Sequence, residues 1–442
     1  MSGLRVLHLT HAHPALGDVG GVELYVHALA RARGDAVFTR DRSGARGLRR
    51  EDGGGYPLWI AGVPSPRAPV FRDTWSVPQV EGLLWEVLRA ERPELVHIHH
   101  LAQLGFGAAR LCAEAGAAVA LTLHDPHLLC ARGQLINRAL ELCPGPGPDR
   151  CAVCLAEHLR ARPGLSALAP LARRLGIDAP LKRAIAAPRP GPAAIAAISA
   201  RNAAGAGVLR GADLVISPSQ HLAERARALG LRERITVLDL PLVAPLRVAP
   251  EPPPGPLRFV FIGALIPTKG PQVLLEAFGA LGEARAGATL TLWGPKVGFD
   301  GAPGFVEALL KRAQATPGAR YAGVFDESGR EAALHDADVL VVPSIWEENS
   351  PLTLREAKAA GLRVIGSAIG GIPELDPQAR LVPPRDPQAL TKAILAEIAS
   401  GRGRRAPALY PMAPHLLALE TLWADTIDAV KRAGGSGVLK AG

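Results

Sequence analysis

The sequence predicts an α/β protein made of two doubly wound domains that face each other across a cleft. Short, continuously apolar runs alternate with longer helical patterns, which is typical of parallel sheets covered by helices on both faces. A proline-rich stretch at 241–256 divides the 442 residues into two halves. Each half opens on a strand, a glycine-containing loop and a helix, beginning at Val6–Leu9 in the first half and Phe259–Gly263 in the second.

Nine apolar runs are expected to form strands, because each is short, aliphatic and bounded by turn residues or helical patterns. They are Arg5–Leu9, Ala36–Thr39, Leu95–His99, Ala118–Leu123, Leu214–Ser217, Arg258–Ile262, Thr289–Leu292, Val339–Val342 and Val364–Gly366.

The linker divides the chain into an N-terminal domain over residues 1–245 and a C-terminal domain over 246–400. A tail over 401–442 contains an amphipathic helix, Pro414–Ala433, which is expected to pack back on the N-terminal domain. In such folds ligands bind where the carboxyl ends of the strands meet. The cleft between the domains is therefore the expected site.

Composition excludes several classes of protein. The hydrophobic fraction of 48% and the charged fraction of 21% argue against wholesale disorder. No run reaches about 18 apolar residues, and the N-terminus lacks the pattern of a signal peptide, so a cytoplasmic protein is expected. No recognised nucleic-acid-binding module occurs, so nucleic acid is not an expected partner.

The net charge of +9 is concentrated in residues 155–210, which hold nine basic residues and two acidic ones. We expect this segment to be a helical insertion in the N-terminal domain. Apolar residues lie at helical spacing around Arg173 and Arg174, which fits a helix resting on anionic lipid at the inner face of a membrane. A helix packed on its own domain explains the same pattern.

The strongest chemical signal is the segment 343–357, which reads PSIWEENSPLTLREA and follows the apolar run Asp338–Val342. Glu348 and Glu356 are separated by seven residues. Pro351 suits the first turn of a helix, so Glu348 is expected in the preceding loop and Glu356 on the helix. Two glutamates at this spacing also occur by chance in many helices, so the surrounding segments carry the identification.

Together with the downstream sequence GGIPE at 370–374, this segment resembles the donor site of the retaining, nucleotide-sugar-dependent glycosyltransferases of family 4, which have the GT-B fold. The resemblance implies that Glu356 binds the ribose hydroxyls of the donor and that Glu348 lies near the transferred sugar as a catalytic residue. Backbone N–H groups at the helix start can hold a diphosphate. The donor-binding residues expected there are Ser350, Pro351 and Leu352.

A second segment, 261–270, ends a strand in Gly263 and places Lys269 just before the next helix. A lysine there can neutralise a leaving diphosphate. Members of the same family usually have an arginine directly after the glycine, where this chain has Ala264. One expected cation is therefore missing, and a lone surface lysine is the alternative interpretation of Lys269.

The loop 17–23, with the sequence GDVGGVE, resembles the N-terminal glycine loop of this family, which approaches the donor phosphates or the acceptor. Gly20 and Gly21 lack a Cβ and so permit a close approach. Glycine-rich turns are common, however, and Glu23 is equally explained as an acid at a helix start.

His124 ends an apolar strand, at the position where the family has a histidine near the transferred sugar or the acceptor. It is therefore the second candidate catalytic residue. Asp125 beside it could tune its charge or accept a proton, and a structural pair at a strand end is the alternative. His99 and His100 also end a strand but form no recognised motif, and we expect them to be structural.

Four cysteines, Cys130, Cys143, Cys151 and Cys154, follow His124 with the spacing C-x12-C-x7-C-x2-C. Four thiolates with a terminal C-x2-C suit a closed, tetrahedral, structural zinc site. A subset of related glycosyltransferases is similar in carrying a four-cysteine loop. Free thiols, disulfides and an iron–sulfur cluster are the alternatives, and catalysis itself is expected to need no metal cofactor.

The resemblance implies an enzyme that moves a sugar from a nucleotide-diphosphate sugar to an acceptor hydroxyl with retention of the anomeric configuration. Polysaccharide or glycolipid synthesis, with a lipid-linked or polysaccharide acceptor, is the expected role. Two alternatives remain, because fold alone does not establish function. One is a nucleotide-sugar-binding protein with weakened catalysis, which Ala264 favours, and the other is a GT-B enzyme of another kind, such as an epimerase.

Overall fold

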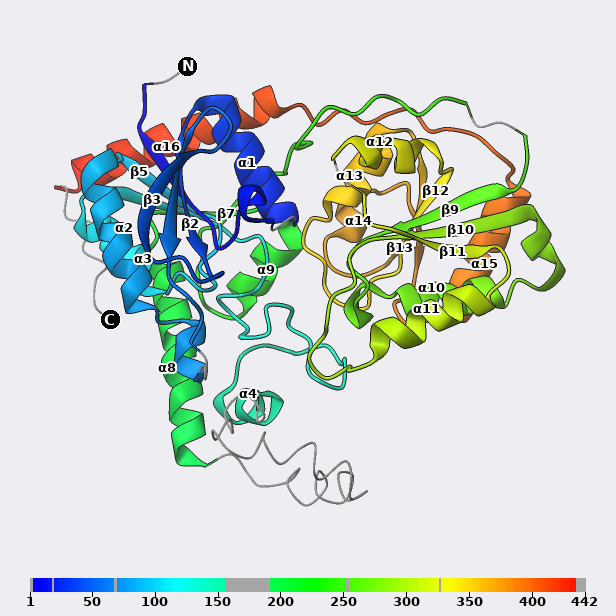
Figure 1. Ribbon diagram of the computed structural model, residues 1–442, viewed down its shortest axis with the longest axis horizontal. Helices are drawn as coiled ribbons and strands as arrows, with labels where there is room; N and C mark the ends of the chain where they lie inside the picture. Colours follow the sequence, from blue (N-terminus) through cyan, green and yellow to red (C-terminus); the bar gives the residue numbers. More distant parts are fainter. Residues whose placement is uncertain are drawn as a thin grey trace.

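Two α/β units lie side by side in the computed structural model (Figure 1). Within the described residues, the first unit has an eight-stranded sheet and the second a six-stranded sheet. Every neighbouring pair of strands is parallel except β3 and β4, which are antiparallel. The predicted α/β fold class is confirmed. The structure describes residues 3–17, 20–66, 70–155, 191–251, 254–325 and 327–434.

All nine predicted strands are present. Each is a buried apolar run in the interior of a sheet, not at its edge. The first sheet has the order β3 (Gly47–Asp52), β4 (Pro57–Gly62), β2 (Ala36–Asp41), β1 (Val6–Leu9), β5 (Leu95–Ile98), β6 (Ala118–Thr122), β7 (Leu214–Ser217) and β8 (Thr236–Val237). The second has the order β11 (Ala319–Gly323), β10 (Ala288–Trp293), β9 (Leu257–Ile262), β12 (Val339–Val342), β13 (Arg363–Ser367) and β14 (Arg380–Val382).

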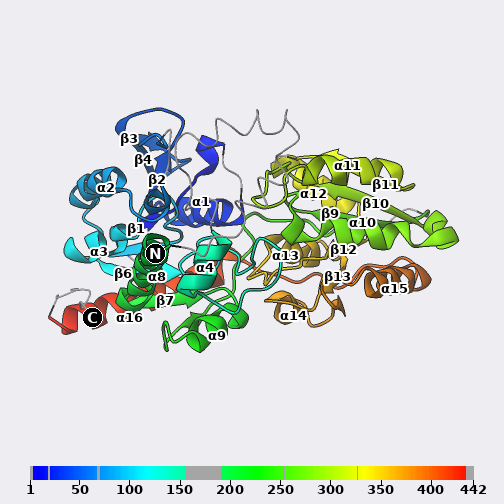
Figure 2. The same ribbon diagram turned by 90° about the horizontal axis from the view of Figure 1, so that it is seen from below.

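Helices cover both faces of each sheet (Figure 2). In the first unit one apolar core joins the sheet to α2, α3, α8 and α9, and another joins it to α1 and α16. In the second unit α10, α11 and α15 share one core, and α12, α13 and α14 share the other. The helices of the first unit are α1 (Gly21–Arg33), α2 (Pro78–Glu91), α3 (Gly107–Glu114), α4 (Pro148–Cys154), α8 (Pro192–Gly211), α9 (Gln220–Ala228) and α16 (Met412–Arg432). Those of the second are α10 (Pro271–Gly279), α11 (Phe305–Ala315), α12 (Glu327–His335), α13 (Leu352–Ala359), α14 (Ile372–Leu375) and α15 (Pro387–Ala399).

The last helix, α16, follows the second unit in the chain but packs on the first. Its Trp423 is fully buried, and Leu419 and Ile427 lie in the same apolar core as Tyr25 of α1. Three large side chains at helical spacing thus tie the end of the described chain to the first sheet.

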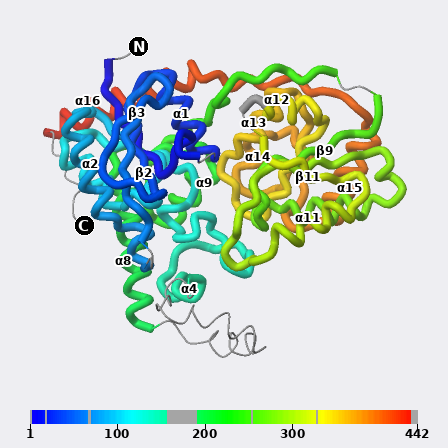
Figure 3. Tube along the Cα trace, viewed as in Figure 1, coloured from blue at the N-terminus to red at the C-terminus, as the bar shows by residue number. Residues whose placement is uncertain are grey.

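The chain crosses between the units twice, and the two crossing segments run next to each other (Figure 3). The N–H of Leu242 in the first crossing donates to the carbonyl of Tyr410 in the second, at 2.9 Å. Neither connection forms a helix or strand in the residues that the structure describes. This hydrogen bond therefore pairs two irregular, proline-containing segments that together join the units.

A long connection follows β6 and reaches the second unit before it returns to α4. Its Ile136 packs against Ile345 and Trp346 of the second unit. Of the predicted basic insertion, the part that includes Arg173 and Arg174 lies outside the described residues, and 192–211 forms α8. Among the described helices, none has both the length and the apolar character needed to cross a bilayer.

Candidate functional site

Lys269 and Glu348 form an ion pair in the second unit. The two residues come from the two separate segments, 261–270 and 343–357, that were each predicted to contribute to the donor site. Lys269 ends a short 3-10 helix before α10, and its Nζ donates to Glu348 Oε1 at 2.7 Å and Oε2 at 2.9 Å. Ser344 Oγ and Trp346 Nε1 also donate to Oε1, at 2.7 and 2.9 Å. Glu348 is only 4% exposed, so these four hydrogen bonds hold a nearly buried carboxylate in one orientation.

Two glycines, Gly370 and Gly371, allow their backbone to pack directly against the backbone of the Glu348 loop. A Cβ on Gly371 would lie 1.9 Å from the carbonyl oxygen of Asn349, and a Cβ on Gly370 would lie 2.3 Å from that of Glu348. The Gly371 N–H donates to the Glu348 carbonyl at 2.7 Å. Any larger residue at these two positions would displace the loop that carries the carboxylate.

The start of α13 contacts the glycine loop of the first unit. Pro351 caps the helix, and the side chain of Leu352 packs with the apolar core of the first unit. A Cβ on Gly21 would lie 3.4 Å from Leu352 Cδ1. Gly20 caps α1, where a Cβ would meet a carboxylate oxygen of Glu23 at 2.4 Å. The structure therefore brings Gly21 and Leu352 together, whereas Gly20 faces Glu23 of its own helix.

Glu356 lies on α13, is 5% exposed and has Arg330 as its ion-pair partner, at 3.0 Å. Burial raises the pKa of Glu356 and the Arg330 charge opposes this rise. Ser350 Oγ accepts a hydrogen bond from Arg355 at 2.6 Å, and Arg355 also pairs with Asp239. Arg330 could not be predicted from the sequence, because it lies 26 residues before Glu356 and outside the glutamate motif, and the pairing of Arg355 with Asp239 joins residues 116 apart.

Asn349 connects the two units directly. Its Nδ2 donates to the carbonyl oxygens of Leu123 and His124, at 2.8 and 2.9 Å, and its Oδ1 accepts from the Ser219 hydroxyl. The Asn349 side chain is buried, so all three hydrogen bonds are shielded from water. The loop after β6, with His124, is thereby held next to the residue that follows Glu348.

A second contact between the units lies at the start of α9. Glu374 accepts hydrogen bonds from the N–H groups of Gln220 and His221, at 2.9 and 3.1 Å. A carboxylate is favoured at the N-terminus of a helix, where N–H groups lack helical partners. The glutamate of the GGIPE segment therefore contributes to the contact between the units.

His124 is half-buried, and burial lowers its pKa to about 3, so its ring is neutral at physiological pH. Asp125 Oδ2 lies 3.1 Å from His100 Nε2, and Asp125 Oδ1 accepts a hydrogen bond from the His127 N–H at 2.7 Å. Burial opposes ionisation of Asp125, but His100 holds the pKa of Asp125 well below its usual value. The carboxylate next to His124 in sequence is thus bound to a different histidine.

The four cysteines line one cavity of about 440 Å³. Cys151 Sγ accepts a hydrogen bond from the Gly147 N–H at 3.4 Å, and burial raises the pKa of the Cys151 and Cys154 thiols. Among the described residues, the only three potential ligand atoms within 4.8 Å of one another come from histidines: His8, His97 and His99. The thiols thus share a cavity without forming a closed tetrahedron.

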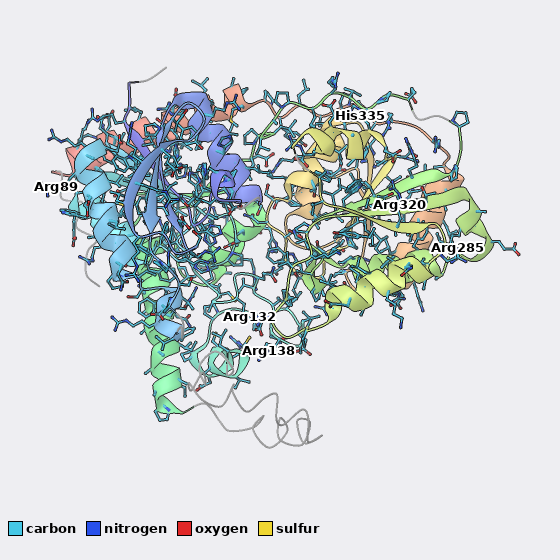
Figure 4. All side chains as sticks on the ribbon, in the orientation of Figure 1. Arg89, Arg132, Arg138, Arg285, Arg320 and His335 are labelled. Atoms are coloured by element: carbon cyan, nitrogen blue, oxygen red, sulfur yellow. The ribbon has the colours of Figure 1, made fainter. Side chains whose placement is uncertain are left out.

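Two arginines of the cysteine loop fasten it to the second unit. Arg132 forms an ion pair with Asp300 and lies over the Phe299 ring at 5.6 Å, and Arg138 lies 3.4 Å from the same carboxylate. Both arginines lie between the units, beside α4 (Figure 4). The cysteine loop therefore contacts the second unit at these arginines and at Ile136.

Comparison with known proteins identifies relatives of both units. Residues 19–240 match the family described as "Glycosyltransferase Family 4", and residues 256–399 match "Glycosyl transferases group 1". The chain is 29% identical over 201 residues to WcaL of Escherichia coli K12, which is named for colanic acid biosynthesis, covering 43% of this chain and 48% of WcaL. It is 31% identical over 164 residues to the amylovoran biosynthesis glycosyltransferase AmsK of Erwinia amylovora, covering 34% and 38%. The chain therefore spans about half the length of WcaL, and less of AmsK.

Solved structures share the fold across nearly the whole chain. Sucrose-phosphate synthase from Thermosynechococcus elongatus superposes with a TM-score of 0.62 at 18% identity, covering 96% of this chain and all of that one. HepE of Anabaena, in complex with UDP and glucose, has a TM-score of 0.54 at 16% identity, with the same coverage. These neighbours confirm the predicted GT-B fold.

Proposed function

Because the chain belongs to glycosyltransferase family 4, we propose that it transfers a sugar from a nucleotide-diphosphate sugar to an acceptor hydroxyl with retention of configuration. One arrangement carries the proposal. The partly exposed Lys269 forms an ion pair with the nearly buried Glu348, and the next residue, Asn349, is hydrogen-bonded to the His124 carbonyl of the other unit. At one contact between the units, the second unit thus supplies a cation and a carboxylate, Lys269 and Glu348, and the first unit supplies the neutral imidazole of His124.

In this proposal each side chain has a separate task. The Lys269 ammonium breaks its hydrogen bond to one of the two Glu348 oxygens and contacts the diphosphate instead. Its positive charge then stabilises the negative charge that develops on the leaving group. The free N–H groups at the start of α13 bind the same phosphates. Glu348 and His124 accept hydrogen bonds from the sugar, and the contact between the units excludes water that would otherwise hydrolyse the donor.

The comparisons support the choice of donor and of acceptor class. HepE binds UDP and glucose, which favours a nucleotide sugar as the donor here. WcaL and AmsK are named for the biosynthesis of polysaccharides, which favours a growing polysaccharide or its lipid-linked precursor as the acceptor. A lipid-linked acceptor would place the protein at the inner face of a membrane.

A thermal-shift screen with UDP, GDP, ADP and TDP, followed by transfer and hydrolysis assays with the matching sugars, tests the proposed function. A ligand at 100 times its Kd stabilises the folded state by about 2.7 kcal/mol, which is easily measured as a rise in Tm. At least one nucleotide is expected to raise Tm and to support transfer. A folded protein that shows no binding, transfer or hydrolysis with the whole panel would contradict the proposal.

Ala264 favours a second candidate, a protein that binds nucleotide sugars without transferring them. The residue after Gly263 supplies no cation, so Lys269 carries more of the phosphate charge alone. The same screen separates the two candidates. Binding with neither transfer nor hydrolysis would favour a binding protein.

We also propose that the four cysteines hold one structural zinc ion. Tetrahedral zinc prefers four sulfur ligands, and the Gly147 N–H already points to Cys151 as it would to a thiolate. The buried Arg201 on α8 interacts electrostatically with Cys130 and Cys151, which suits a site with a net negative charge. The sulfurs would have to move closer together when the ion binds.

Protein purified without chelator is expected to contain about one zinc per chain, measured by elemental analysis. Cys151→Ser should remove the zinc and lower Tm, because the loop that packs Ile136 on Trp346 loses its anchor. Cys112→Ser is the control for zinc content alone, since Cys112 lies in the core away from the cavity and its own replacement by a polar residue also lowers Tm. Absence of stoichiometric metal after anaerobic purification would rule out the zinc site.

A further inference from the structure

A line of four hydrogen-bonded groups crosses the core of the first unit and ends at His124. His8 Nε2 lies 3.3 Å from Asp35 Oδ2, and His8 Nδ1 lies 3.0 Å from His99 Nε2. His99 Nδ1 in turn lies 3.2 Å from His124 Nε2. The four residues stand in or at the ends of β2, β1, β5 and β6, which are consecutive neighbours in the sheet.

Asp35 sets the direction of every hydrogen bond in this line. Burial opposes ionisation of Asp35, but the hydrogen bond with His8 and the ion pair with Arg33, at 2.6 Å, hold the pKa of Asp35 below its usual value. An ionised carboxylate can only accept, so His8 Nε2 carries the hydrogen. In its neutral form the His8 ring has a single N–H, so His8 Nδ1 then accepts from His99 Nε2.

The same reasoning continues to the end of the line. His99 Nε2 carries its hydrogen, so His99 Nδ1 accepts from His124 Nε2. Burial holds the pKa of His99 well below its usual value and lowers that of His124 to about 3, so neither ring gains a second hydrogen at physiological pH. The hydrogen of His124 therefore lies on Nε2, and its Nδ1 keeps a lone pair.

Packing keeps the rings from turning over. His8, His97 and His99 are each at most 1% exposed, and the rings of His97 and His99 stack with centroids 4.1 Å apart. The Nε2 of His97 bonds to Thr122 Oγ1 at 2.7 Å, so His97 supports the line without belonging to it. A ring flip in such a close-packed interior would force its neighbours to move.

We propose that Asp35, His8 and His99 are positioning residues, which fix the tautomer of His124 so that its Nδ1 accepts a hydrogen bond from a hydroxyl group of the sugar donor or acceptor. The use of that lone pair rests on the proposed function, whereas the tautomer itself does not. In the opposite tautomer, Nδ1 would present a hydrogen, and a hydroxyl would have to turn its oxygen toward the ring.

The tautomer is measured directly by ¹⁵N NMR of imidazole-labelled protein, with His124→Gln used to assign the signals of His124. In the native protein the hydrogen is expected on Nε2 of His124. Asp35→Asn preserves the size of the side chain but offers both a donor and an acceptor, so His124 is expected to show a substantial population of the Nδ1–H form. A native His124 with its hydrogen on Nδ1, or one that Asp35→Asn leaves unchanged, would overturn the proposal.

Asp338→Asn is the matched control for the activity measurement. Asp338 also immediately precedes a parallel strand, is buried and pairs with an arginine, Arg258, but it contacts no histidine of this line. Asp35→Asn is expected to lower kcat/KM for transfer about tenfold, which equals about 1.4 kcal/mol, and Asp338→Asn to leave it near the native value when both are assayed well below their Tm.

Equal losses in the two variants would show a general effect of stability and overturn the positioning role. The two proposals fail separately. If the native protein transfers no sugar, the proposed function fails, while the NMR measurement on native and Asp35→Asn protein still decides the tautomer. If Asp35→Asn does not fold, the native His124 tautomer alone can contradict the proposal.

Discussion

Replacing Lys269 by alanine is expected to lower kcat/KM for sugar transfer about 100- to 1,000-fold. Removing one group that stabilises the developing charge of a transition state typically costs this much. Lys269 is the cation of the 261–270 segment, and Ala264 supplies no second one. Steady-state transfer kinetics with the donor found in the nucleotide screen measures the loss.

The Lys269→Ala protein also leaves Glu348 buried without its cation, which is destabilising in itself. The double variant Lys269→Ala/Glu348→Gln removes this unpaired charge and is expected to recover Tm but not activity. Lys311→Ala, on the exposed face of α11, is the control for loss of a lysine. Recovery of activity in the double variant would contradict a role of Lys269 in binding the diphosphate.

Replacing Asn349 by aspartate is expected to lower transfer at least about 100-fold, because a carboxylate would face the two carbonyl oxygens that the amide now binds. An uncompensated buried charge costs about 3–5 kcal/mol, enough to separate the units at this contact. Binding of the nucleotide to the second unit should change much less. Transfer kinetics and nucleotide titration on the same protein therefore distinguish the two effects.

Asn202→Asp on α8 adds the same charge at a site away from this contact and is expected to leave transfer unchanged. Ser219→Ala removes only the hydroxyl that donates to Asn349 Oδ1, so a smaller loss is expected. If Asn349→Asp transfers sugar at the native rate, closure of the two units around Asn349 is not needed for the reaction.

The sequence predicted the central strands because a strand buried on both faces must be apolar throughout. It missed β4, β8, β11, β14 and β3, all of them at a sheet edge or next to one. The residues of β3, Gly47–Asp52, are largely exposed and include two arginines, a glutamate and an aspartate. This strand is an antiparallel edge strand, so its pattern is set by pairing with β4 rather than by burial. Local sequence therefore predicts the interior strands of a sheet better than the strands at its edges.

The candidate site was predictable where a motif is local, and it was missed where partners are far apart in the chain. The segment around Glu348 and the loop of Lys269 could each be identified from neighbouring residues, but Arg330 and Asp239 could not. His99, which was expected to be structural, is hydrogen-bonded to His124. The sheet order places β5 between β1 and β6, and this order was the signal that would have brought the histidines of these strands together.

The position of Asn349 illustrates the same limit. Its side chain binds carbonyl oxygens more than 220 residues away, on the loop after β6. Any residue can supply a carbonyl oxygen, so the partner leaves no trace in the sequence. Contacts of this kind are visible only once both units are placed.

A crystal structure with the nucleoside diphosphate that gives the largest rise in Tm tests the central claim most directly. We predict that a phosphate oxygen lies within about 3.2 Å of Lys269 Nζ, beside the start of α13, and that Lys269 has released at least one oxygen of Glu348. A diphosphate bound elsewhere, with the Lys269–Glu348 pair intact, would contradict the account.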